Sequence, residues 1–121
     1  MDAPPAPDRA PPSATVVVVG RSPEKMREAT AVLEASGFTV IGVFSDGEAR
    51  RAIADQERLL AVVAGGSVSP EARERLRAAA APRGAVIIDA NIGHGDPADH
   101  FRSVVLPQLV TARTAQAADH A

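Results

Sequence analysis

Residues that could carry out chemistry follow each of four apolar runs in the sequence. Glycine, serine and arginine backbone or side-chain groups suit an anion, whereas aspartate, asparagine and histidine suit a general base or a polar ligand. The candidate ligand- or anion-binding residues are Gly20, Arg21, Ser22, Gly65, Gly66, Ser67, Asp89, Asn91 and His94.

A dinucleotide site would need a G-x-G-x-x-G loop, because only glycine lets the backbone approach a pyrophosphate closely. Starting from Gly20, the second and third glycine positions hold Ser22 and Lys25, so the fingerprint fails. Asp46, after the second apolar run, could bind a ribose, but Asp-Gly between a strand and a helix is more typical of a turn and a helix cap.

The pair Gly65-Gly66 has two interpretations. Its backbone N–H groups could form an anion-binding concavity in front of a helix. The interpretation we favour is a tight turn that requires positive φ angles, which glycine adopts without steric cost.

The segment from Asp89 to His100 contains two histidines and three aspartates, which could supply a general base or a metal site. The spacing matches no metal-ligand motif, and Asp96-Pro97 is typical of a helix start. We therefore expect a loop and a helix cap here, with no metal, no cofactor and no catalytic residue.

The four apolar runs, TVVVVG, FTVIGVF, LLAVVAGG and AVIIDA, are apolar at nearly every position. Such runs are typical of parallel strands covered on both faces. Amphipathic stretches separate them, and two open with Ser-Pro-Glu, at Ser22 and Ser69, where serine caps the helix and proline fits its first turn. The pattern predicts an α/β fold, a small doubly wound four-stranded parallel sheet in the order 2-1-3-4. Ligands of such sheets lie at the carboxyl ends of the strands.

Composition sets the boundaries of this domain and excludes several partners. Residues 1–14 are rich in proline and alanine, so we expect a disordered tail, one domain over 15–118 and a disordered end at 119–121. The chain has no cysteine, three aromatic residues and a net charge of -2, which argues against thiolate chemistry and nucleic-acid binding. With no signal-peptide pattern and no apolar run of membrane-spanning length, we expect a cytoplasmic protein without a membrane partner.

From Thr15 to about Ala90 the chain resembles a response-regulator receiver domain. The resemblance rests on the apolar first run, on SGF at 36–38 and on SDGEARRAI at 45–53, where receivers commonly carry an alanine-aspartate-glycine-glutamate-alanine type of segment. It implies a flavodoxin-like fold and a regulatory role in signal transduction.

The residues that receivers use for phosphotransfer are not present. Receivers hold magnesium with an acidic pair after the first strand and accept phosphate on an aspartate after the third. Those positions fall here on Gly20, Arg21 and Gly65, and a hard cation needs carboxylate oxygens. The fourth-strand hydroxyl aligns with Asp89, and the fifth strand with its lysine has no counterpart. The resemblance therefore implies a degenerate, shortened receiver that aspartyl phosphate does not switch.

Arg21 and Asp89 carry opposite charges on the same predicted edge. An ion pair between them would replace the metal-mediated bridge of a receiver. The alternative, which we favour, is two solvated charges that contribute little.

The last amphipathic stretch, about 97–118, predicts a helix that Pro107 kinks. The fourth strand is an apolar edge that the C-terminal helix or a second copy should cover. The run VVL exceeds what one helix face needs, so we expect a homodimer or protein-partner interface at Val104, Val105, Leu106, Leu109 and Val110.

These observations predict a non-enzymatic regulatory or protein-interaction module, a pseudo-receiver that works without phosphorylation. The alternative is a small-ligand or nucleotide-binding protein that uses the carboxyl-end edge of the sheet.

Overall fold

The computed structural model describes residues 14–56, 58–65, 68–90 and 96–119. All four strands run parallel in one sheet, in the order β2-β1-β3-β4. The strands are β1 (Thr15–Val19), β2 (Thr39–Val43), β3 (Ala61–Gly65) and β4 (Val86–Ala90). This arrangement confirms the predicted α/β architecture and strand order, and it is consistent with a flavodoxin-like fold.

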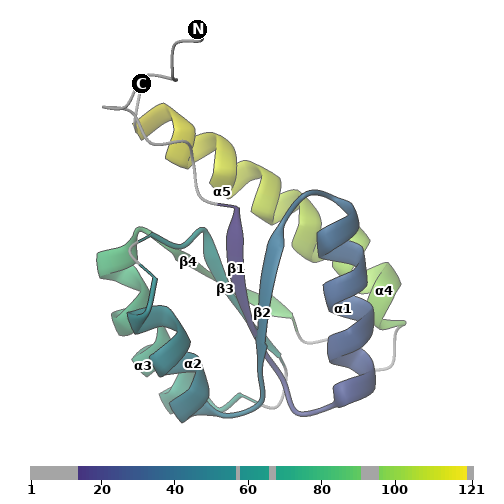
Figure 1. Cartoon of the computed structure of the whole chain (residues 1–121), viewed down its shortest axis with the longest axis horizontal. Coiled ribbons are helices and arrows are strands. Elements are labelled where there is room, and N and C mark those ends of the chain that lie inside the picture. The colour runs from purple at the N-terminus through teal and green to yellow at the C-terminus, as the bar shows by residue number, and fades with distance from the viewer. Residues whose placement is uncertain (1–13, 57, 66–67, 91–95, 120–121) are drawn as a thin grey trace, which may run out of the picture.

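Helices cover both faces of the sheet (Figure 1). On one face lie α1 and the C-terminal elements α4, η2 and α5, and on the other lie α2 and α3. Their bounds are α1 (Pro23–Ala35), α2 (Asp46–Ala54), α3 (Pro70–Ala80), the 3₁₀ turn η1 (Ala81–Arg83), α4 (Pro97–His100), the π-helical turn η2 (Phe101–Val105) and α5 (Leu106–Asp119).

The central strand β1 explains why its apolar run is continuous. Val16 and Val18 pack with Leu33 of α1 on one face, whereas Val17 and Val19 pack on the opposite face against α2 and α3. All four valines are buried, at 5% exposure or less. Because both faces are covered, alternation of polar and apolar residues would place polar groups in a core.

A serine side chain caps each of the first three helices. The hydroxyl oxygens of Ser22, Ser45 and Ser69 accept hydrogen bonds from backbone N–H groups three residues later, at 3.3, 3.1 and 3.1 Å. The capping roles that the sequence predicts for Ser22 and Ser69 are confirmed. Each cap satisfies a backbone donor that a helix start leaves free, and the three helix N-termini all follow the carboxyl ends of strands.

The predicted interruption of the C-terminal helix is present as a widened turn. The N–H of Leu106 donates to the carbonyl of Phe101, five residues back, at the end of η2. Pro107 has no N–H, and its ring crowds the carbonyl of Ser103 one turn earlier. The π-helical turn accommodates that disturbance immediately before α5 begins.

The residues expected at an interface divide into two groups. Val105 and Leu109 have no exposed surface and belong to the chain's own core, which corrects their assignment to an interface. Leu106 is partly buried against that core, whereas Val104 and Val110 are 41% and 46% exposed. The excess of apolar residues in VVL arises because η2 and α5 bury one row and leave the neighbouring residues at the surface.

Neighbouring residues of α5 provide a direct test of this assignment. Leu109→Ala should lower the free energy of unfolding by about 2–5 kcal/mol, because it leaves a cavity in the core. Val110→Ala should change it by less than about 0.5 kcal/mol. Urea denaturation followed by circular dichroism measures both, and equal effects would contradict the core position of Leu109.

Candidate functional site

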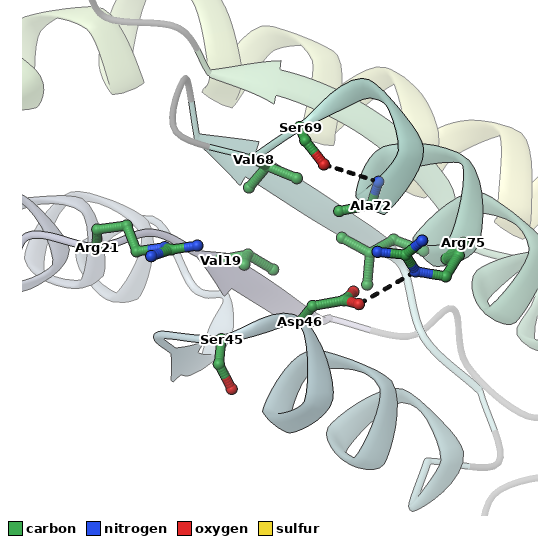
Figure 2. Close-up of a pocket in the computed structure, with 9 residues that line it drawn as sticks. Val19, Arg21, Ser45, Asp46, Val68, Ser69, Ala72 and Arg75 are labelled. Atoms are coloured by element: carbon green, nitrogen blue, oxygen red, sulfur yellow. Dashed lines mark hydrogen bonds and ion pairs between the residues drawn. The ribbon is translucent and has the colours of Figure 1, made fainter.

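The carboxyl ends of β1 and β2 and the starts of α2 and α3 surround a pocket of about 180 Å³. Figure 2 shows Arg21 approaching from the end of β1 with its guanidinium directed towards this space, and Ser69 and Arg75 coming from α3 and the turn before it. The residues that line it are Val19, Arg21, Ser45, Asp46, Val68, Ser69, Ala72, Arg75 and Leu76.

Asp46, the first residue of α2, is held by arginine side chains. Its Oδ2 atom lies 3.2 Å from Nε of Arg75 and 3.7 Å from Nε of Arg50, and Figure 2 shows the contact with Arg75 across the pocket. Glu48 completes the helix start, since its Oε1 atom accepts a 2.8 Å hydrogen bond from the N–H of Phe44. The SDGE sequence thus forms a turn and helix cap, which confirms the interpretation favoured from the sequence.

Asp89, at the carboxyl end of β4, is paired with Arg73 of α3. Nη1 of Arg73 lies 3.1 Å from Oδ1 of Asp89, and Nη2 donates to the Gly65 carbonyl at 3.2 Å. The side chain of Arg73 is 25% exposed, so one guanidinium ties α3 to the ends of β3 and β4. Neither interpretation of Asp89 made from the sequence holds, because its partner is Arg73 and not Arg21 or solvent alone.

Arg21 is exposed, and no ion pair within the described part of the chain includes it. Among the described residues of this edge, Arg21 is therefore a cation that an external group could reach. Sequence reasoning singled out Arg21 but missed Arg73, whose position next to Ala72 in the buried stripe of α3 was the available signal.

Gly65 is required for space. A Cβ atom added there would lie 3.1 Å from the Val19 carbonyl oxygen and 3.8 Å from the Gly20 Cα atom. Gly65 itself does not adopt the positive φ angle expected in the Gly65-Gly66 turn, since among the described glycines only Gly37 (φ 92°) and Gly84 (φ 75°) do so. At Gly20 an added Cβ would make an ordinary contact, 3.7 Å from Cε of Met26.

The segment after β4 is described from Asp96 onward. Oδ2 of Asp96 accepts a 3.0 Å hydrogen bond from the N–H of Asp99, which confirms the predicted helix cap. His100 contacts the Phe101 ring edge to face, with centroids 6.2 Å apart. The candidates Gly66, Ser67, Asn91 and His94 lie outside the described residues.

Two searches of the described ranges bear on the kind of site. They contain no group of three or more histidine, cysteine, aspartate or glutamate residues arranged to hold a metal ion. In the same ranges no helix combines the length and apolar character that crossing a membrane requires.

Comparison of the chain with protein-family models, with curated proteins and with solved structures finds no match. What the site can do therefore follows from its geometry. The carboxylates of Asp46 and Asp89 are paired with guanidinium groups of α3, and the exposed Arg21 lines the same pocket as Asp46.

Gly65→Ala should lower the free energy of unfolding by about 1–3 kcal/mol, because the methyl group would press on a backbone carbonyl of the central strand. Gly20→Ala is the matched control and should change stability by less than about 0.5 kcal/mol. Urea denaturation of both variants measures the difference, and a neutral Gly65→Ala variant would contradict the close approach.

Arg73→Ala should cost about 1 kcal/mol of stability, mostly from the lost hydrogen bond to Gly65, since an ion pair with a largely exposed carboxylate contributes little. Arg21→Ala should leave the thermal midpoint unchanged. If Arg21→Ala were the more damaging substitution in scanning calorimetry, the assignment of Arg73 as the tie between α3 and the sheet would fail.

Proposed function

We propose that this chain is a non-enzymatic regulatory module of receiver-like fold that binds a protein partner, a second copy included, without being phosphorylated. The observation that carries the proposal is the environment of Gly65. The phospho-acceptor aspartate of a receiver corresponds to this position, where a Cβ atom would lie 3.1 Å from the Val19 carbonyl. The Cβ atom of an aspartate there would press on this carbonyl, which would have to give by a few tenths of an ångström.

The charges around Gly65 also support the proposal. Divalent cations such as Mg²⁺ bind carboxylate oxygens, but the carboxylates of Asp46 and Asp89 already face Arg75 and Arg73. Arg21 adds a further positive charge where the family keeps an acid. A cation that approached this edge would meet a guanidinium group beside each aspartate.

Support for a protein partner comes from the surface. Four large apolar side chains in the described part of the chain are 41–46% exposed: Phe44, Val86, Val104 and Val110. Two of them, Val86 and Val104, belong to β4 and to the helical turn that packs on it. Exposed apolar side chains that gather into one patch are a common feature of protein interfaces.

The pocket beside Arg21 favours a second candidate function, the binding of a small anionic ligand or nucleotide. A volume of about 180 Å³ lined by Arg21 and the hydroxyl groups of Ser45 and Ser69 offers donors to such a ligand. The carboxylate of Asp46 in the same wall opposes it, which is why the interaction module is the preferred function.

Thermal denaturation with beryllofluoride and Mg²⁺, a mimic of aspartyl phosphate, tests the proposal. We expect an unchanged melting temperature and, after incubation with acetyl phosphate, no phosphoryl adduct in the intact mass. A stabilised protein or an adduct would contradict the proposal, because binding to the native state alone must stabilise it.

The same assay with a panel of nucleotides and inorganic phosphate separates the second candidate. A ligand-induced rise in melting temperature that disappears in Arg21→Ala would replace the interaction module by a ligand-binding function. Ser36→Ala is a suitable control, since Ser36 lies at the C-terminal end of α1, away from this pocket.

A further inference from the structure

Strand β4 lies at one edge of the sheet, and the structure describes no strand beyond it. The N–H of Val86 donates to the Leu60 carbonyl at 3.3 Å, on the β3 side. Because hydrogen-bonding groups alternate along a parallel strand, Ile88 also faces β3, whereas the N–H and C=O groups of Ile87 and Asp89 point away from the sheet.

This edge lacks two features that often prevent strand pairing, an edge lysine and a proline. Its sequence, VIIDA, has no lysine or proline, and Val86 is 46% exposed. The opposite edge, β2, contains Gly42 in its interior, which weakens a strand. The C-terminal helical elements pack on one face of β4, through Phe101, Val105 and Leu109, and so cover that face of the strand.

We propose that β4 pairs antiparallel with β4 of a second copy, around a twofold axis at Ile88, to form one continuous eight-stranded sheet. In this register the N–H of Ile87 donates to the carbonyl of Asp89 of the second copy, and the N–H of Asp89 donates to the carbonyl of Ile87 there. The twofold axis repeats both bonds, so every outward-facing backbone group of Ile87 and Asp89 is satisfied.

The side chains on one face fit this register. Val86 at the start of β4 lies opposite Ala90 of the second copy. The turn η2, which carries the exposed Val104, contacts β4 and shares a core cluster with Ile88 and Ala90. In the paired sheet the exposed Val86 of one copy would approach the η2 turn of the other.

The charges on the opposite face are complementary. Asp89 keeps 65% of its side chain exposed, with Arg73 on one side. Arg77 lies one turn after Arg73 on the same side of α3, towards the start of β4, and now contacts only the exposed Glu74 among the described ion pairs. Since Ile87 lies opposite Asp89 of the second copy, Arg77 is positioned to pair with that carboxylate.

This inference rests on the proposed interaction function and names its partner. The two can fail separately. If the chain is monomeric, the β4 pairing is wrong, but the proposal that the edge around Gly65 is not phosphorylated still stands. If beryllofluoride stabilises the chain, the proposed function is wrong, but β4 can still pair with a second copy.

Sedimentation velocity of the full chain tests the pairing. We expect a species of twice the 12.5 kDa chain mass and a monomer for Val86→Lys, which introduces an edge lysine. Phe44→Lys and Val110→Lys are matched controls with comparable exposure on other surfaces, and both should stay dimeric. A monomeric wild type, a dimeric Val86→Lys variant, or a dimer lost in Val110→Lys would overturn the proposal.

The register has its own test, which does not depend on how well Val86→Lys folds. The chain has no cysteine, so Val86→Cys/Ala90→Cys introduces the only thiols. Under mild oxidation this double variant should form a disulfide-linked dimer, because residues 86 and 90 oppose each other in a non-hydrogen-bonded pair. Val86→Cys alone should remain uncrosslinked. Equal crosslinking of the two variants, or none in the double variant, would exclude the register.

Discussion

The close approach of β1 and β3 at Gly65 is the constraint on which the carboxyl edge of this sheet depends. The two central strands pack so tightly that a Cβ atom at Gly65 would crowd the Val19 carbonyl. A reactive or metal-binding side chain at this strand end would have to fit beside that carbonyl, where the contact is tight. Arginine and serine side chains from the turns and helices that follow the strands line this edge instead.

Helix α3 completes that edge electrostatically. Arg73 and Arg75 belong to the same helix and contact carboxylates on either side of it, Asp89 near the end of β4 and Asp46 at the start of α2. The guanidinium of Arg73 also binds the carbonyl of Gly65. In a domain with this strand order, the carboxyl edge of the sheet is where ligands usually bind. Here Arg73 connects α3 to the ends of β3 and β4, and Arg75 connects it to the start of α2.

Much of this architecture could be predicted from the residues. Continuous apolar runs indicated parallel strands covered on both faces, and Ser-Pro-Glu marked two helix starts, because both signals are local. The partner of Asp89 could not be found in the same way. Whether Arg21 or Arg73 reaches it depends on which side of α3 faces β4, and that follows from the packing of Ala72 and Leu76 in the core.

Two other differences between the sequence predictions and the structure also arise from tertiary packing. The glycine signal at Gly65 was visible, but its reason, space and not a positive φ, depends on the distance between two strands that are far apart in sequence. In VVL, the π-helical turn before Pro107 changes which residues face the sheet, so Val105 is buried and Val104 is not. A regular α-helical period of about 3.6 residues per turn does not account for this wider turn, so it could not predict which of these residues are buried.

The most direct test of the central claim is a titration of the ¹⁵N-labelled protein with Mg²⁺ at constant ionic strength, followed by the backbone amide signals of Arg21, Gly65 and Asp89. If guanidinium groups hold the carboxylates of this edge, these signals should move no more than those of an exposed residue of α1 such as Glu28. Saturable shifts at the three residues, with Glu28 unchanged, would show a cation site and contradict the account.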